Sequence, residues 1–144
     1  MLKVKELILL KDNPVWTISP DESVSKAVQL LTEKKIGALP VVENSSVIGI
    51  ISERDIVRAV DREGTAALNL LVEQVMIKEV IVISAETTLE DCMNLMTDYH
   101  FRHLPVLEGD ELVGIVSIRD LIKKVLPQRD ALIEDLEKYI RGGH

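Results

Sequence analysis

The most constraining feature of this sequence is a pattern that occurs twice. The stretch at 49–55 reads Gly-Ile-Ile-Ser-Glu-Arg-Asp, and the stretch at 114–120 reads Gly-Ile-Val-Ser-Ile-Arg-Asp. An ungapped shift of 65 residues aligns 18–58 with 83–123, and 13 of these 41 pairs are identical. The chain is therefore an internal tandem repeat, and we expect its two units to share one local fold.

Each repeat is expected to form a strand, a helix, two further strands and a last helix. Short apolar runs at 15–18 and 80–83 predict the first strands. β-Branched runs on either side of the polar turns 43–46 and 108–111 predict two hairpins. The alternation of strands and helices predicts a mixed α/β (α+β) fold.

Local signals predict where the first helix of each repeat begins and ends. Ser19 with Glu22, and Thr87 with Glu90, have the spacing of a capping box. Gly37 is expected to stop the first of these helices, because glycine readily adopts the left-handed conformation found after a helix.

The repeat suggests three segments along the chain. Residues 1–64 would hold the first unit with an apolar lead-in, and 65–127 the second unit with a connecting segment. Residues 128–144 carry an apolar stripe at helical spacing, which predicts an amphipathic helix that covers its own chain or a partner.

The composition indicates a compact, soluble chain. Its 144 residues are 47% hydrophobic, enough to fill a core without disulfides. Cys92, the single cysteine, lies at helical spacing from apolar residues, so we expect a core residue and not a reactive thiol. Apolar runs of about six residues fall far short of the ~20 that span a bilayer, and no secretory signal is visible. We therefore expect a cytoplasmic protein that does not enter a membrane.

Charge and motifs disfavour further classes. The net charge of −7 is spread thinly and no basic stripe is interleaved with aromatic residues, which argues against general nucleic-acid binding. The three histidines have no partners at metal-ligand spacing, and no phosphate loop, dinucleotide fingerprint or nucleophile motif occurs. We expect neither an enzyme nor a required cofactor.

The strongest candidates for a site are the residues where a buried strand becomes a helix. Ser52 is a favoured N-cap, and Asp55 lies in the first turn, where the helix dipole stabilises a negative charge. Capping does not explain Arg54, because a cation there opposes the dipole. A bound anion would remove that conflict, so capping and anion binding both stay open. The second repeat carries the same three residue types, as Ser117, Arg119 and Asp120.

The two repeats differ just before the Leu-Pro pair at the start of their second expected strand. Arg102 and His103 precede Leu104 in the second repeat, where the first repeat has Gly37 and Ala38. Two readings are open: solvated charges at the start of a strand, or one cleft that is more basic than the other.

These residues closely resemble the CBS domain, named after cystathionine β-synthase. The resemblance rests on the Leu-Pro-Val strand, the polar turn and the Gly-x-x-Ser-x-x-Asp pattern, and it covers about 15–126 in two copies. It implies a CBS pair, or Bateman module, in which two units pack through their sheets about a pseudo-twofold axis and enclose two clefts. Such modules typically bind AMP, ADP, ATP or S-adenosylmethionine.

The resemblance also implies the residues of each cleft. The acidic residue of the pattern is expected to bind ribose and the serine to lie near phosphate, with the facing residues supplied by the opposite unit. The first cleft would then contain Ser52, Arg54, Asp55, Gln74, Met76, Arg102, His103, Leu104 and Pro105, and the second Gly37, Ala38, Leu39, Pro40, Ser117, Arg119 and Asp120.

The function expected from the resemblance is that of a regulatory module. It would bind an adenosine-type ligand and signal to a protein partner, and it would form a homodimer through the outer faces of its helices. The alternative is a structural or oligomerisation module with empty clefts, in which the Ser/Asp pairs only cap helices.

Overall fold

A computed structural model of the chain describes residues 2–10, 14–125, 134, 136–138 and 140. Most of the predicted C-terminal segment, 128–144, lies outside these residues. In the part of the chain that is described, no helix combines the length and the apolar content needed to cross a membrane.

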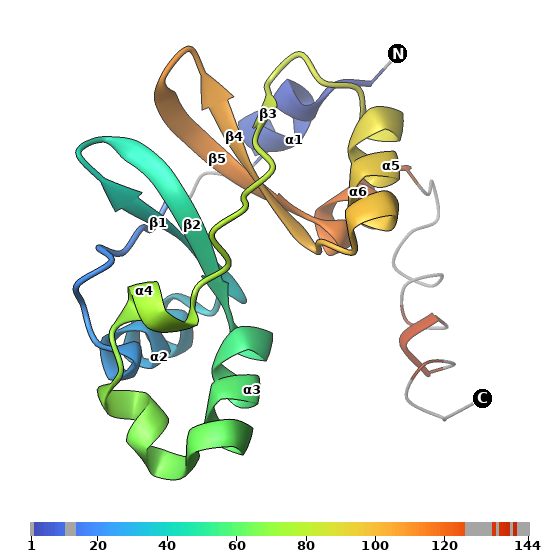
Figure 1. The fold of residues 1–144 in the computed structure, drawn as a ribbon. Helices are drawn as coiled ribbons and strands as arrows, with labels where there is room; N and C mark the ends of the chain where they lie inside the picture. The colour runs from blue at the N-terminus through green and yellow to red at the C-terminus, as the bar shows by residue number, and fades with distance from the viewer. Residues whose placement is uncertain (1, 11–13, 126–133, 135, 139, 141–144) are drawn as a thin grey trace.

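The two repeats form two similar α+β units, as predicted. The first unit contains α2 (Val24–Lys34), β1 (Ala38–Glu43), β2 (Ser46–Ser52) and α3 (Glu53–Glu63). The second contains β3 (Ile83–Ser84), α5 (Leu89–Tyr99), β4 (His103–Glu108), β5 (Glu111–Ser117) and α6 (Ile118–Val125). The β1/β2 and β4/β5 hairpins lie towards the centre of the molecule, and the pairs α2/α3 and α5/α6 lie on the outside (Figure 1).

The hairpins form where the sequence predicts them, and their registers match. Ala38 pairs with Ser52 in the first hairpin, and His103 with Ser117 at the same place in the second. Each has one register shift, after Val41 and after Val106. The first turn places Asn44 and Ser45 at φ of 52° and 66°, the left-handed geometry of the tightest hairpin turns. The repeated sequence therefore produces repeated geometry at the strand that leads into each site.

The first strand of each repeat is shorter than predicted. In the first unit only Ile18 pairs, as an isolated parallel bridge to Val41. In the second unit β3 comprises Ile83 and Ser84, which pair in parallel with β4. The predicted strand at 15–18 is therefore wrong except for its last residue, because Val15 and Trp16 turn away from the sheet and line a cavity.

The predicted helix caps are each misplaced. The N-caps are Ser23 and Thr88, whose side-chain oxygens accept hydrogen bonds from Lys26 N and Asp91 N, both at 3.1 Å. Ser19 instead lies in the preceding turn, where its carbonyl accepts from Glu22 N at 3.2 Å. The helix ends at Lys34, followed by Lys35 in the left-handed conformation at φ 55°, and not at Gly37. Serine and threonine both favour the N-cap, so residue type alone does not distinguish Ser19 from Ser23 or Thr87 from Thr88.

Each core is completed by a segment from outside its repeat. Helix α1 (Val4–Leu10) contributes Val4 and Leu7 to the core of the second unit. The connection between the units, η1 (Gly64–Asn69) and α4 (Val72–Val75), contributes Val72 to the core of the first unit. Backbone hydrogen bonds fix both segments, Val4 N to Thr87 O and Val24 N to Leu70 O, each at 2.8 Å. The packing units therefore cross the repeat boundary at 64/65.

Candidate functional site

The first candidate site is built at the junction of β2 and α3. Asp55 is only 9% exposed, and its Oδ2 accepts hydrogen bonds from Ser52 N at 2.9 Å and Ser52 Oγ at 2.8 Å. Ser52 Oγ in turn accepts from Asp55 N at 3.3 Å, which completes a capping box. The other carboxylate oxygen of Asp55, Oδ1, accepts no hydrogen bond from a described residue. The carboxylate therefore serves the helix with one oxygen and keeps the other available.

The second repeat reproduces this junction between β5 and α6. Ser117 N donates to Asp120 Oδ2 at 2.9 Å, and Asp120 N donates to Ser117 Oγ at 3.1 Å. The expected capping role is thus observed in both repeats. It accounts for the serines and aspartates, but it gives no role to the arginine between them.

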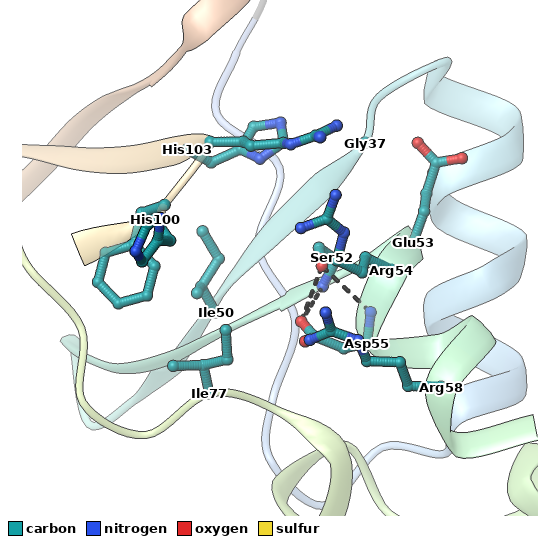
Figure 2. Close-up of a pocket in the computed structure, with 12 residues that line it drawn as sticks. Gly37, Ile50, Ser52, Glu53, Arg54, Asp55, Arg58, Ile77, His100 and His103 are labelled. Carbon is teal, nitrogen blue, oxygen red and sulfur yellow. Dashed lines mark hydrogen bonds between the residues drawn. The ribbon is translucent and has the colours of Figure 1, made fainter. Parts of the chain in front are cut away.

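A cavity of about 360 Å³ lies against the first junction. The first unit contributes Ser52, Arg54, Asp55 and Arg58, and the second unit contributes the segment 100–103. Figure 2 shows Arg54 and Arg58 on the α3 side, with His100 and His103 across the cavity. Arg54, Arg58 and Arg102 have no ion-pair partner among the described residues, so the cavity gathers three unpaired guanidinium groups beside the carboxylates of Glu53 and Asp55.

The second cleft consists of two adjoining cavities that share Ile36, Ala38 and Ile115. The inner cavity, about 400 Å³, is mostly apolar and is lined by Trp16. Lys34 Nζ lies over the Trp16 ring, 4.0 Å from the ring centroid. This is a cation–π contact. The second cleft therefore has an apolar compartment with an aromatic wall.

The outer cavity of the second cleft, about 380 Å³, lies against the second junction. It contains Lys35 and Arg119 beside Ser117 and Asp120. The guanidinium of Arg119 donates to the carboxylate of Glu137, so part of its charge is compensated. This compensation distinguishes Arg119 from its counterpart Arg54.

Three residues line both the first cavity and the outer cavity of the second cleft: Gly37, Arg102 and His103. The sequence had associated Arg102 and His103 with the first cleft and Gly37 with the second. A Cβ atom on Gly37 would lie 3.0 Å from Glu53 Oε1 and 3.5 Å from His103 Nε2. The small residue at this position lets the two units approach closely between the clefts.

The remaining expected site residues lie elsewhere. Leu39, Pro40, Leu104 and Pro105 are fully buried strand residues and line none of these cavities. Gln74 is exposed, and its side-chain oxygen accepts from Leu71 N at 2.9 Å.

Met76 lies against Gly49, and the adjacent Ile77 lines the first cavity in its place. Of the residues predicted for the two clefts, the structure thus brings together the Ser, Arg and Asp residues with Arg102, His103, Gly37 and Ala38.

Several lining residues escaped the reading of the sequence. Arg58 lies four residues after Arg54, a spacing that puts both on one face of α3 and could have revealed it. Trp16 is the single tryptophan of the chain and was counted as part of a strand. Lys35 and His100 gave no motif in the sequence, and the structure shows each as the residue that follows the end of a helix.

Comparison with known proteins agrees with this architecture. The model of the CBS domain matches residues 4–62 and 72–127. The crystal structure of a CBS-domain containing protein from Agrobacterium tumefaciens is similar, with a TM-score of 0.82 and 39% identity over 86% of this chain and 99% of that one. CBSX2, solved in complex with AMP, has a TM-score of 0.71 and 26% identity over 86% of this chain and 96% of that one.

A curated relative extends beyond the matched region. The mitochondrial CBS domain-containing protein CBSX3 of Arabidopsis thaliana is 35% identical over 129 residues, which are 86% of this chain and 63% of that protein. Two tandem α+β units with matched strand-to-helix junctions define the class of CBS-pair proteins. The chain belongs to the CBS-domain family.

Proposed function

We propose that this chain is a regulatory CBS pair that binds adenosine-type ligands, AMP, ADP, ATP or S-adenosylmethionine, between its two units. The observation that carries the proposal is the first cavity, which is lined by Asp55, a carboxylate with one uncommitted oxygen, and by three arginines that have no ion-pair partner among the described residues. A carboxylate can accept hydrogen bonds from ribose hydroxyls, and guanidinium groups bind phosphate with charge-assisted hydrogen bonds.

Cavity size and a relative support this proposal. The first cavity, about 360 Å³, is within the range of small-molecule sites. The relative CBSX2 was solved with AMP. The second cleft adds an apolar compartment beside Trp16 that suits a flat ring. The module would hold its ligand without transforming it, and would act on a protein partner that is not yet identified.

Ligand-dependent stabilisation tests the proposal. Thermal unfolding is measured with AMP, ADP, ATP, S-adenosylmethionine and a guanine nucleotide, because a ligand at 100 times its dissociation constant adds about 2.7 kcal/mol to the stability. We expect stabilisation by at least one adenosine compound, and its loss when Asp55→Ala and Asp120→Ala are combined. No stabilisation by any of them would contradict the proposal and favour a purely structural module, whose Ser/Asp pairs serve only as caps.

We also propose that the module forms a homodimer through the outer helices. A shallow groove of about 220 Å³ lies between α2 and α3 and includes Val28, Leu31, Ile56 and Val57, the last of which is 67% exposed. Sedimentation should find a dimer at micromolar concentration, and Val57→Glu should shift it towards the monomer. A monomeric parent protein would contradict this assignment.

A further inference from the structure

Arg102 and His103 line the first cavity and the outer cavity of the second cleft, so one pair of basic side chains borders both candidate sites. The other lysines and arginines border one cleft each: Arg54 and Arg58 the first, and Lys34, Lys35 and Arg119 the second. Gly37 also lines both cavities, and its lack of a side chain leaves room for Glu53 and His103 beside its backbone.

We propose that this pair couples the two clefts electrostatically, so that a phosphorylated ligand in one cleft weakens the binding of a second phosphorylated ligand in the other. The inference rests on the proposed nucleotide function. It concerns how the clefts act on each other, which neither the repeat nor the capping geometry implies.

The charges at the boundary give the coupling its sign. A phosphate monoester carries about −1.5 to −2 charges at neutral pH, so two bound ligands bring about −3 to −4. Arg102 carries one positive charge, and His103 adds at most one more. The first ligand therefore uses most of the shared positive charge, and the second meets a neutralised pair and a nearby anion. The weakening is reciprocal, because coupling free energies act equally in both directions.

The cations that line only one cleft decide which cleft binds phosphate first. The first cleft adds Arg54 and Arg58, which have no ion-pair partner among the described residues, whereas Arg119 of the second cleft is paired with Glu137. Phosphate should therefore enter the first cleft first. The second cleft, with its apolar compartment at Trp16, should then accept an uncharged nucleoside more readily than a second nucleotide.

Calorimetric titration of the unaltered protein tests the coupling directly. With AMP, we expect two binding steps. The affinity in the second step should be at least about fivefold lower than the affinity of the same cleft in a protein whose other cleft is disabled. A fivefold change is the lower end of typical allosteric couplings. The reference affinities come from Asp120→Ala, which retains the first cleft, and Asp55→Ala, which retains the second. With adenosine the weakening should be absent, and with AMP it should decrease as salt is added.

Matched variants locate the coupling. In the two single-cleft proteins, Arg102→Ala should weaken AMP binding in both, by roughly tenfold. Arg58→Ala should do so only in the protein that retains the first cleft, and Lys35→Ala only in the other. Arg62, exposed in the last turn of α3 and lining none of these cavities, supplies a control, since Arg62→Ala should change neither affinity.

The outcomes separate this inference from the function on which it rests. If no AMP binds to the unaltered protein, the proposed function fails and the coupling fails with it. If AMP binds in two steps that match the single-cleft affinities, or if Arg102→Ala weakens only one cleft, the coupling is wrong and the nucleotide function stands. If the aspartate variants do not fold, Arg102→Ala in the otherwise unaltered protein decides, because an unchanged spacing of the two AMP steps would overturn the coupling and a smaller spacing would support it.

Discussion

The two clefts share one repeated junction but are closed by different parts of the chain. In the first unit, Gly49 is covered by the segment before the second repeat, and Ile50 and Ile77 exchange backbone hydrogen bonds of 3.0 and 2.9 Å. In the second unit, Gly114 is covered by the side chain of Ile8 from α1. A backbone that is tied to the sheet makes a fixed wall, whereas an isoleucine side chain can move. The repeat thus sets the frame of both clefts, and segments outside it make them unequal.

The largest expected effect comes from removing the contribution of α1 to the second unit. Leu7 is 5% exposed in that core, so Leu7→Ala should lower the free energy of unfolding by about 2–5 kcal/mol. Urea denaturation measures this loss, and Leu2→Ala is a control because Leu2 is 41% exposed.

The alkylation rate of Cys92 shows whether the loss of stability in Leu7→Ala affects the core of the second unit. Its thiol is fully buried in the same core, and burial raises the pKa of Cys92 to about 11, so it should resist alkylation in the native protein. Leu7→Ala should speed alkylation of this residue. An unchanged alkylation rate together with a stability loss below about 1 kcal/mol would show that α1 is not part of the core.

The paired glycines test the difference between the two walls. A Cβ atom on Gly49 would lie 2.5 Å from Met76 Sδ and 2.9 Å from the carbonyl oxygen of Ile77, whereas on Gly114 it would lie 3.2 Å from a side-chain carbon of Ile8. Gly49→Ala should therefore destabilise the protein by about 1–3 kcal/mol, and Gly114→Ala by less. Thermal unfolding of both variants measures the contrast. Equal losses would mean that the first wall yields as easily as the second.

Nucleotide affinity sharpens the comparison of the clefts themselves. Because Arg54 beside Asp55 has no ion-pair partner among the described residues, whereas Arg119 beside Asp120 is paired with Glu137, Asp55→Ala should reduce AMP affinity more than Asp120→Ala, by about tenfold or ~1.4 kcal/mol. Calorimetry well below the melting temperature of both variants measures the affinities. This precaution is needed because loss of each cap also reduces stability by about 0.5–2 kcal/mol. A greater loss for Asp120→Ala would reverse the assignment.

The smallest expected effect concerns the charged contact that holds α1 on the second unit. Lys3 Nζ lies 2.8 Å and Lys5 Nζ 3.4 Å from the carboxylate of Glu86, and the hydrogen bond from Lys3 is the main reason that the pKa of Glu86 is lowered. A lowered pKa stabilises the fold above the unfolded-state pKa, and this contribution is lost as pH falls through the folded pKa. Glu86→Gln should thus cost a little stability at pH 7 and still less at pH 3.

High salt supplies the control for this contact. The groups are exposed, so screening should reduce the difference between Glu86→Gln and the parent protein at pH 7. A difference that grows on acidification would contradict the ion pair as its source.

Local patterns in the sequence predicted part of the fold and part of the site. The hairpins and the pairs Ser52/Asp55 and Ser117/Asp120 form where they were expected, because turn residues and caps act within a few positions of one another. The caps of α2 and α5 were misplaced because Ser19 and Ser23, like Thr87 and Thr88, are residue types that favour an N-cap, and the capping-box spacing pointed to the wrong one.

By itself, the sequence determined that the chain is two copies of one strand-to-helix frame, each with a serine and an aspartate at the helix start. Only the tertiary structure decided that α1 completes the second unit, that Trp16 leaves its strand to line the second cleft, and that Arg102 and His103 border both clefts. Periodicity and capping act over a few residues, whereas these contacts join residues far apart in the chain. They depend on how two complete units pack, and no local pattern encodes that packing.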